Sequence, residues 1–591
     1  MSKPYKGFRP PWIEERAPEG SYREIFKWGH HTETKVPKES LYKMMKEIFK
    51  MTDDDFREPK ETGYDKVGFD VPVKLSEEVI ADLKAIAGDK NVRTDDYARL
   101  SVAYGKTMHD LMRLRKKVIE NIPDVVVYPE NKEQIEKIVA YVSEHKIPLY
   151  VYGGGSSVTR GVECVKGGVS LDMRLNFNKV IAFNEVNQTI TVEAGMSGPQ
   201  LEEHLNNAVK EFGAKRAYTC GHFPQSFEYS SVGGWTVTRG AGQNSTYYGK
   251  IEHIVLGQEY ATPVGVIKTD DYAAKACGPD INQIMMGSEG AFGVLTHVTL
   301  RFFRYMPQNR VKFSYLFKSW ADAQAAAREI MQGEFGMPSV FRLSDPEETE
   351  LMLRLYGVDE IPGALKLFNA LGYPQFDINK SLEGEINGEG KCLFLGWSEG
   401  ERGFARNQAK QVKKICHAYG ALGLGAFPVK GWEKGRFKDP YLRDSMQDFG
   451  IMTDTLECTV NWDNMDYVHK FVRAYCKSRP NTICTTHMSH AYPQGANLYF
   501  IFITKMSELD DYLQYHRGIL DHIQESGAAI SHHHGIGKMF APWLEGFLGG
   551  NQMDILRCLK QHFDPDDVMN PGGTIAVDLD EDKKVFKRPR W

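Results

Sequence analysis

The sequence predicts an α+β protein with more than one domain, and three regions support this. A β-α-β unit ending in a glycine loop spans residues 123–157. Residues 168–305 are rich in strands and turns, and strands alternate with amphipathic helices from about 306 to 480. Because a chain of 591 residues is too long for one hydrophobic core, we expect these regions to form separate domains.

The first half of the chain begins with a helical extension and continues into the β-α-β unit. Apolar residues have helical spacing in LSEEVIADLKAIAG, residues 75–88, and in YGKTMHDLMRLRKKVIENI, residues 104–122. PDVVVYPE is a predicted strand, and the next helix places Ile135, Ile138, Val139 and Val142 on one face. IPLYVYGGGSS is then a strand that runs into glycines.

The second half of the chain is predicted to form a sheet covered on one face by helices. VKFSYLF and KCLFLGW are predicted strands, and ADAQAAAREIMQ and ERGFARNQAKQVKKICHAYG are amphipathic helices. MDILRCLKQHFDPDDVMNPG is a helix followed by a turn. The predicted division is an N-terminal, mostly helical extension at 1–119, a first domain at 120–305, a cap domain at 306–550, and a C-terminal helix and tail at 551–591 that return to the first domain.

Composition excludes several classes of protein. The net charge of -5 gives no sign of a nucleic-acid partner. The nine cysteines form no CxxC pair, which favours reduced thiols over a disulfide framework or an iron–sulfur site. The sequence contains no apolar run of about 18 residues and no apolar secretion signal at its start, so we expect a cytoplasmic protein.

Three glycine-rich loops are candidates for one ligand site. They are GGGSS at residues 153–157, PQSFEYSSVGGWTVTRGAG at 224–242 and GPDINQIMMGSEGAFGVLTHVTL at 278–300. Glycine lets backbone N–H groups approach an anion closely, although a single such loop is more often a tight turn. None is a GxGxxG fingerprint or a Walker loop. Together, in a β-rich region, they could wrap one extended phosphate-bearing ligand.

These loops resemble those of a flavoprotein superfamily. YGGGSSVTRGVE, FEYSSVGGWTVTRGAG and GPDINQIMMGSEGAFGVLT are similar to the FAD-binding domain of the vanillyl-alcohol-oxidase/PCMH flavoproteins. FRLSDPEE, PYLRDSMQDFG, DTLECTVNWDN, SHAYPQGANLYF and SHHHGIGK resemble, in order, the alkyldihydroxyacetonephosphate synthases within it. The resemblance covers roughly residues 95–575. It implies a two-subdomain PCMH-type FAD-binding domain plus a cap domain whose antiparallel sheet is covered by helices.

The resemblance also implies which residues bind FAD. Residues 153–157 would hold the pyrophosphate, the second loop would line the flavin, and residues 287–293 would hold the rest of the dinucleotide. Gln225 departs from the family, which more often has an acidic residue there. No histidine lies in the first loop, so we expect non-covalent FAD. The predicted cofactor-binding residues are Gly153, Gly154, Gly155, Ser156, Ser157, Pro224, Ser226, Ser231, Gly234, Thr238, Ala241, Gly242, Glu289, Gly290 and Val294.

Three adjacent histidines in SHHHGIGK, residues 531–538, leave a metal site, an acid/base site or a solvated loop as alternatives. In a strand, consecutive side chains point to opposite faces, so the three imidazoles would not share one purpose. The D-lactate and D-2-hydroxyglutarate dehydrogenases of the superfamily carry metal-binding motifs at two similar places. Here Tyr499 replaces one of the histidines and His533 replaces a glutamate. We therefore predict no bound metal.

The synthase resemblance implies the catalytic set. Tyr492 would be an acid/base, and Arg342 and Arg443 would bind phosphate or carboxylate, for which a guanidinium is well shaped. Lys538 could add a charge. The plainer interpretations are a core tyrosine, surface ion pairs and packed or solvated imidazoles. The predicted catalytic residues are Tyr492, His532, His533, His534, His490, Arg443 and Arg342.

Two enzyme functions follow, beside a flavin-binding protein without turnover. In the first, implied by the resemblance, a fatty alcohol replaces the acyl group of acyl-dihydroxyacetone phosphate while flavin N5 holds the carbon skeleton. In the second, the flavin oxidises an alcohol or 2-hydroxy acid and passes electrons to a partner protein or quinone. His490, which departs from the synthase pattern, favours the second. Expected partners are a lipid substrate, a membrane surface in peripheral contact and a second copy of the chain in a dimer.

Overall fold

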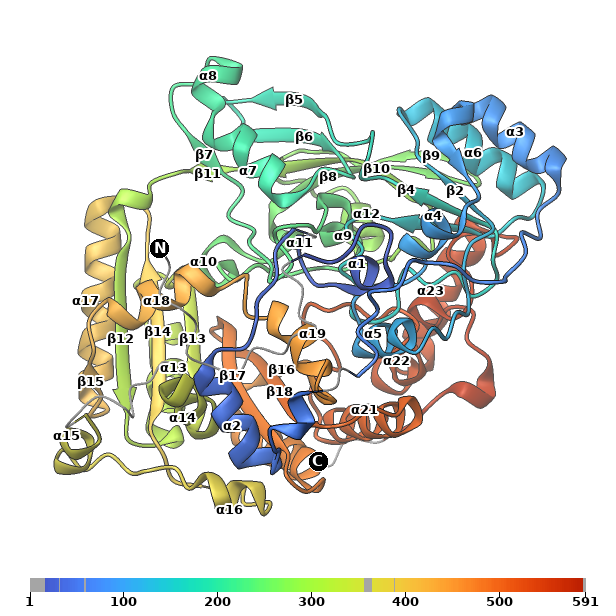
Figure 1. The fold of residues 1–591 in the computed structure, drawn as a ribbon. Coiled ribbons are helices and arrows are strands. Elements are labelled where there is room, and N and C mark those ends of the chain that lie inside the picture. The colour runs from blue at the N-terminus through green and yellow to red at the C-terminus, as the bar shows by residue number, and fades with distance from the viewer. Residues whose placement is uncertain (1–15, 31, 58–59, 356–363, 387, 588–591) are drawn as a thin grey trace, which may run out of the picture.

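The computed structural model has the α+β architecture that the sequence predicts (Figure 1). It describes residues 16–30, 32–57, 60–355, 364–386 and 388–587. Its main sheets have four, five and seven strands, and β7 (Tyr218–Thr219) and β11 (Phe303–Arg304) add a two-stranded ribbon.

The four-stranded sheet carries the predicted β-α-β unit, in the order β1-β2-β4-β3. Its strands are β1 (Val92–Arg93), β2 (Val125–Val127), β3 (Leu149–Tyr152) and β4 (Val169–Asp172), of which the last three are parallel. Helix α6 (Lys132–Glu144) begins after the capping side chain of Asn131 and buries the four predicted apolar residues. The helical period therefore identified the buried face correctly.

The five-stranded sheet is antiparallel, in the order β5-β6-β10-β8-β9. Its strands are β5 (Val180–Asn184), β6 (Thr189–Glu193), β8 (Val255–Thr262), β9 (Gly265–Lys268) and β10 (Val294–Arg301). The short helix α9 (Val232–Val237) packs beside β10 and begins at Ser231, whose side chain accepts a hydrogen bond from the Gly234 N–H. The second glycine loop is thereby attached to this sheet.

The seven-stranded sheet, here called the cap sheet, is antiparallel throughout, in the order β15-β12-β14-β13-β17-β18-β16. Its strands are β12 (Val311–Phe317), β13 (Val340–Ser344), β14 (Cys392–Ser398), β15 (Leu422–Gly423), β16 (Ile451–Asn461), β17 (Ile483–Tyr492) and β18 (Gly495–Lys505). The helices that pack on it include α13 (Trp320–Gln332), α17 (Arg402–Ala418), α20 (Met465–Lys477) and α21 (Leu509–Glu525). This is the helix-covered antiparallel sheet that was predicted.

Both ends of the chain return to these sheets. Near the start, Arg23 makes a two-pronged ion pair with the buried Asp448, at 2.8 and 3.0 Å, and Arg115 reaches the same carboxylate at 2.8 Å. Near the end, after α22 (Ala541–Leu548) and α23 (Gly550–Phe563), residues 568–570 pair with Leu149 of β3.

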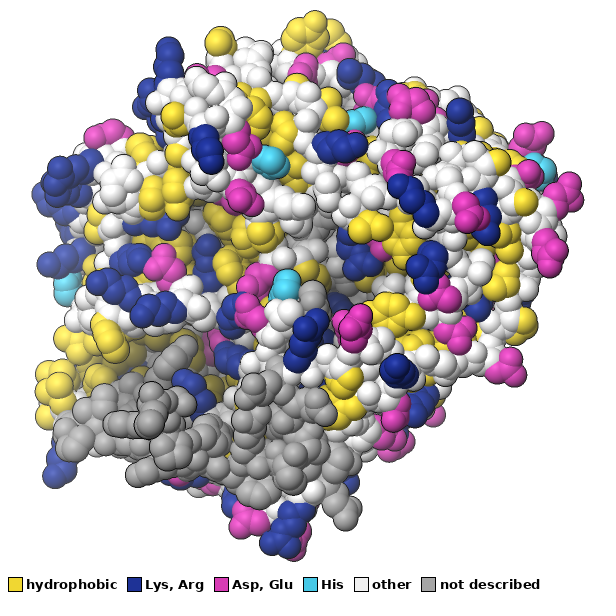
Figure 2. Space-filling view, turned by 45° about the horizontal axis from the view of Figure 1, so that its top comes forward, with side chains coloured by type: hydrophobic (Ala, Val, Ile, Leu, Met, Phe, Trp, Pro, Cys, Tyr) yellow, Lys and Arg dark blue, Asp and Glu magenta, His cyan; other side chains and the backbone are white. Residues whose placement is uncertain are grey.

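The surface has mixed charge. Acidic and basic side chains intermingle over the face drawn in Figure 2, in keeping with a net charge of -5. Within the described residues, no helix is both long and apolar enough to span a membrane.

Candidate functional site

A cavity of about 820 Å³ lies where the glycine loops meet the cap sheet. Parts of all three glycine-rich loops line it, although they stand far apart in the sequence. Across from them, β13, β17 and β18 contribute side chains, as do α2 (Glu39–Phe49), α14 (Pro346–Leu355), α18 (Phe427–Gly435) and α19 (Tyr441–Gln447). The cavity therefore draws on both halves of the chain.

The first two glycine loops touch each other, and glycine is required where they do. A Cβ on Gly153 would lie 2.4 Å from the Ser231 hydroxyl oxygen, and one on Gly154 would lie 2.4 Å from the Tyr229 carbonyl oxygen. Gly155 adopts a φ of +67°, which favours glycine. This floor of glycines and serine hydroxyls suits a ligand whose phosphates approach the backbone closely.

Most of the predicted cofactor residues line the cavity. Thirteen of the fifteen do so, and the exceptions are Gly242 and Val294. Gly242 packs against the backbone, since a Cβ there would come within 2.3 Å of the Phe223 nitrogen. Val294 is fully buried in a hydrophobic cluster. These two residues therefore do not reach the cavity, and their predicted role in binding the cofactor stays a prediction.

Strand alternation places the polar side of the cap sheet toward the cavity. On β17 and β18, Met488, Phe500 and Phe502 point into the hydrophobic core, whereas His487 and Tyr499, on the opposite faces of their strands, line the cavity. Neither His487 nor Tyr499 was among the predicted site residues. The T-T-H-M-S-H alternation of β17 was the signal that could have identified His487.

Arg342 belongs to a buried network in the cavity wall. Its guanidinium donates to Glu348 at 2.7 Å and lies 3.0 Å from His487 Nε2, while His487 Nδ1 is 3.1 Å from the same carboxylate. Burial by itself would raise the pKa of Glu348, but the Arg342 and His487 groups outweigh burial and lower this pKa to about 2. Arg342 is thus already paired with a carboxylate.

Arg443 also lines the cavity and is also engaged. Its Nη1 donates to the Lys106 carbonyl at 2.5 Å, its Nη2 lies 3.2 Å from Asp444 Oδ1, and its guanidinium stacks 5.3 Å from the Trp28 ring centroid. Lys538, in contrast, is outside the lining and donates to Asn570 at 2.7 Å.

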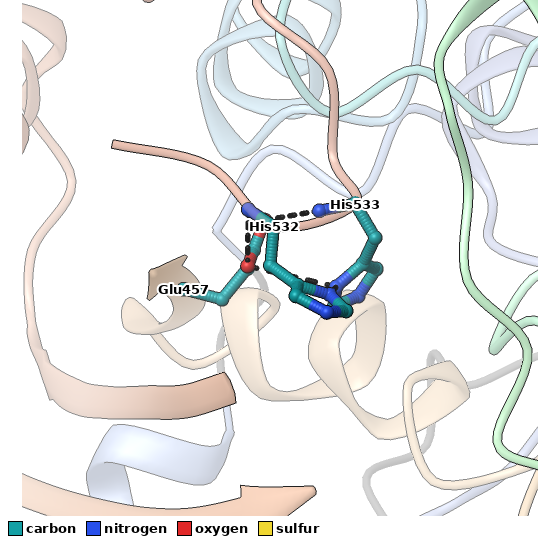
Figure 3. A group of neighbouring side chains, drawn as sticks. All are labelled: Glu457, His532 and His533. Carbon is teal, nitrogen blue, oxygen red and sulfur yellow. Dashed lines mark hydrogen bonds and ion pairs between the residues drawn. The ribbon is translucent and has the colours of Figure 1, made fainter. Parts of the chain in front are cut away.

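The histidine run forms a loop anchored by a carboxylate that the sequence analysis did not single out (Figure 3). Glu457 of β16 is fully buried and accepts hydrogen bonds from the backbone N–H groups of His532, His533 and His534 at 2.8 to 3.1 Å. It also accepts from the Ser531 hydroxyl at 3.1 Å and the Asn497 amide at 2.7 Å. A glutamate at a buried strand position within the quoted ECTVN stretch was the available signal.

The other end of the loop is held from the opposite side of the cavity. Glu289 accepts from the N–H groups of Ile536 at 2.7 Å and Gly537 at 2.8 Å. Burial raises the pKa of Glu289 to about 7, although these two N–H groups and Lys538 oppose the rise. One carboxylate from the cap sheet and one from the third glycine-rich loop therefore fix the histidines in place.

The imidazoles of the loop differ in their access to the cavity, although His532 Nδ1 and His533 Nδ1 lie 3.1 Å apart. His533 and His534 line the cavity, whereas His532 Nε2 lies 2.8 Å from the Tyr492 hydroxyl oxygen, and both His532 and Tyr492 are outside the lining. His490 lines the cavity and shares a hydrogen bond of 2.7 Å with the Ser245 hydroxyl. The structure thus groups the predicted histidines with Tyr492 but gives only some of them access to the cavity.

Burial keeps these imidazoles neutral. It lowers the pKa of His490 to about 3 and lowers the pKa values of His532 and His533 well below the ordinary histidine value. Burial also raises the pKa of Tyr492, so its hydroxyl keeps its proton at neutral pH. The cluster can donate and accept hydrogen bonds without carrying a net charge.

One group of possible metal ligands occurs among the described residues. Ligand atoms of Glu457, His532 and His533 all lie within 4.8 Å of one another. The Glu457 oxygens, however, already accept hydrogen bonds from the loop backbone. A metal on Glu457 would compete with those bonds for the oxygen lone pairs, so the geometry describes a loop anchor better than an open metal site.

Comparisons with known proteins agree with this geometry. Residues 123–270 match the family model described as FAD binding domain, and residues 306–574 match the C-terminal domain of FAD linked oxidases. The alkyldihydroxyacetonephosphate synthase of Dictyostelium discoideum is 31% identical over 527 residues, which cover 87% of this chain and 83% of that protein. The chain belongs to the FAD-linked oxidase family of flavoproteins.

Further members of the family are similar over most of their length. The alkyldihydroxyacetonephosphate synthase of Trypanosoma brucei brucei is 28% identical, with 85% of this chain and 81% of that protein covered. A solved alkyldihydroxyacetonephosphate synthase superposes with a TM-score of 0.75 at 26% identity, covering 93% of this chain and 99% of that one. Like them, this flavoprotein is an FAD-dependent enzyme, and its glycine-lined cavity fits the cofactor.

Proposed function

We propose that this enzyme is a transferase of the alkyldihydroxyacetonephosphate synthase type, with FAD held non-covalently. It would exchange the acyl group of acyl-dihydroxyacetone phosphate for a fatty alcohol, releasing the fatty acid and forming an ether lipid. The synthases among its relatives support this proposal, and so does the shape of the site.

The observation that carries the proposal is an apolar arm of the cavity. One apolar part of the lining is formed by side chains from α2, α14, α19, β17 and β18. They are Leu41, Met44, Met45, Ile48, Phe49, Leu351, Met352, Leu355, Leu442, Met446, Ile483, Ile501 and Ile503. Burying each methylene of a ligand in such an arm contributes about 0.8 kcal/mol. A long alkyl chain gains from this lining, whereas a small 2-hydroxy acid would leave it unused.

The chain's own residues would bind and orient the reactants. His533, His534 and His490 present neutral imidazoles to the cavity, suited to hydrogen bonds with a ketone or hydroxyl oxygen. The Tyr492 hydroxyl, bonded to His532, is a proton donor held next to them. When bound, FAD supplies an electron sink at the reacting carbon.

The same residues are less well suited to the oxidoreductase alternative. Oxidation of an alcohol needs a base that removes the hydroxyl proton, with a pKa near the working pH. Burial lowers the pKa of His490 to about 3, which makes its neutral imidazole a weak base.

The proposal is tested by product analysis. Purified enzyme reconstituted with FAD is incubated with acyl-dihydroxyacetone phosphate and a labelled fatty alcohol, and lipids are separated. We expect labelled ether lipid and free fatty acid in equal amounts, and no reaction when the alcohol is offered alone. Acid precipitation should release the flavin into solution, since it is not covalently bound. Oxidation of the alcohol without fatty-acid release would replace the proposal with a dehydrogenase.

A further inference from the structure

The lining of the cavity is more basic than the chain as a whole. Its described residues include seven lysines and arginines against four acidic residues, whereas the whole chain has a net charge of -5. The basic residues are Lys35, Lys38, Arg342, Lys434, Arg436, Lys438 and Arg443, and the acidic ones are Glu289, Glu348, Asp439 and Asp454. An excess of positive charge in an enclosed site favours an anionic ligand.

Ion pairs already engage four of these cations. Lys35 pairs with Asp439 at 2.7 Å and Lys438 with Glu228 at 2.6 Å, and the partners of Arg342 and Arg443 are described above. Lys38 and Lys434 are exposed, and their charges are well solvated. Arg436, directly after α18, is the remaining basic residue of the described lining.

Aromatic rings surround Arg436, and no ion-pair partner for it occurs among the described residues. Its guanidinium lies 4.5 to 5.5 Å from the ring centroids of Phe437, Phe223 and Trp397. Among the described residues, its side chain has one hydrogen-bond acceptor, Asn244 Oδ1 at 3.1 Å, for five N–H donors. Burial lowers its pKa to about 10, so the group is still charged at neutral pH.

The acidic residues near Arg436 are committed elsewhere. Glu399 pairs with Arg310 at 2.5 Å, and Glu433 pairs with Lys312 and also lies 3.7 Å from Arg310. A partly buried cation without a paired carboxylate is costly unless a ligand supplies the negative charge. The free donors of Arg436 form the planar fork that phosphate binds in a two-pronged manner.

Two glutamines hold the backbone at this position. Gln225 donates to the Arg436 carbonyl oxygen, and Gln243 donates to the same oxygen at 3.3 Å and to Gln225 Oε1 at 2.9 Å. A carboxylate in place of Gln225 could not donate these bonds. Gln225 therefore helps to fix the backbone at Arg436.

We infer that Arg436 binds the phosphate monoester of the substrate and so determines its specificity. The inference rests on the proposed function for the identity of the substrate, but the anion site itself stands on the geometry of Arg436. The phosphate would lie against this guanidinium while the alkyl chain occupies the apolar arm.

The test compares Arg436→Met with wild type on two substrates. We expect KM for acyl-dihydroxyacetone phosphate to rise about 10- to 100-fold, the usual effect of losing hydrogen bonds to a charged group. The same measurement with acyl-dihydroxyacetone, which lacks the phosphate, should give similar values for both proteins. Lys434→Met, which removes an exposed cation of the same lining, should change KM by less than about threefold. Arg436→Lys should restore part of the affinity for acyl-dihydroxyacetone phosphate.

A binding assay separates this inference from the proposed function. Dihydroxyacetone phosphate or dihydroxyacetone is titrated into the FAD-loaded enzyme while the flavin absorbance is followed. Phosphate-dependent binding that Arg436→Met abolishes, with FAD content and thermal stability retained, supports the site even if no exchange is catalysed. Equal binding by both proteins overturns the inference, and so does a variant that loses FAD, because Arg436 would then serve the cofactor.

Discussion

At the scale of single residues, the arrangement of the site depends on Glu457, a carboxylate that lies outside the cavity lining. Glu457 holds three consecutive backbone N–H groups and so sets the directions of His532, His533 and His534. A glutamine in place of Glu457 would have one acceptor oxygen and one NH2 donor group. Its NH2 group would therefore face backbone N–H groups of the loop, with which it forms no hydrogen bond. The orientation of the imidazoles is therefore predicted to depend on this one side chain.

The variant Glu457→Gln tests this dependence. We expect kcat to fall on the order of 100-fold, the usual contribution of one well-placed acid/base group, while FAD remains bound. Glu347→Gln is a matched control, since Glu347 is also a fully buried carboxylate facing the cap sheet but pairs with Arg473 and Lys477. The control should lose stability and keep kcat. Equal kcat losses in both variants would mean that Glu457 only supports the fold.

Sequence reasoning found the histidines and Tyr492 but could not rank their access to the cavity. The motif placed all of them at one site, and the structure divides them between the lining and the layer behind it. Arg342 and Arg443 were predicted to meet the substrate, yet each forms an ion pair with a carboxylate of its own quoted motif, Glu348 and Asp444. The sequence shows that these carboxylates are near but not that they pair with the arginines. Arg436 lay outside every quoted motif.

At the scale of elements, helix α2 makes the N-terminal extension part of the cavity wall. Its apolar face includes Leu41, Met45 and Ile48, which are buried, and these residues line the cavity. The helix packs beside α14, which lies some 300 residues further along the chain. Helical periodicity predicts such faces, but it does not say which distant surface they cover.

A bulky residue on α2 should shorten the accepted alkyl chain. We expect Met45→Trp to reduce activity with a sixteen-carbon alcohol by at least about tenfold while an eight-carbon alcohol is affected little, because overfilling the arm excludes the longer chain. Lys43→Trp, at an exposed position of the same helix, is the control. Competition assays with mixed alcohols measure the ratio, and an unchanged chain-length profile would place the alkyl chain elsewhere.

Local periodicity predicted the individual elements better than their order in the sheets. The β-α-β unit, α6, α13, α17, β12 and β14 appear where apolar spacing indicated. The order of the cap sheet did not follow from the sequence, since β13 joins β14 to β17 across more than 80 intervening residues. Pairing of that kind depends on side-chain packing in three dimensions rather than on local pattern.

At the scale of the whole molecule, the protonation of Glu289 makes the stability of the junction between the two halves of the chain depend on pH. Its pKa is raised from 4.5 to about 7 by burial, so the neutral carboxyl is favoured in the folded protein. Its contribution to stability is therefore complete below about pH 4.5 and is lost as pH rises through about 7. This pKa shift changes the free energy of unfolding by on the order of 3 kcal/mol between the two pH limits.

The variant Glu289→Gln should remove this dependence. Thermal unfolding of the FAD-free protein is measured at pH 5 and pH 8, and we expect wild type to lose more stability over this range than the variant. Glu202→Gln is the control for FAD affinity, because burial also raises the pKa of Glu202 to about 7 but this residue is outside the cavity lining. FAD affinity should fall with pH in wild type and in Glu202→Gln, and stay level in Glu289→Gln. If FAD affinity changed with pH in the same way in all three proteins, the proposed role of Glu289 would be contradicted.

A redox-neutral exchange on a lipid leaves the flavin oxidised, whereas a dehydrogenase reduces it. Anaerobic absorbance of the FAD-loaded enzyme during turnover distinguishes the two reactions. With acyl-dihydroxyacetone phosphate and a fatty alcohol, we expect fatty acid to be released while the band of oxidised flavin persists. Alcohols and 2-hydroxy acids alone should leave the band unchanged. Rapid bleaching by one of these hydroxy compounds, without fatty-acid release from the phosphate ester, would rule out the exchange and identify a dehydrogenase.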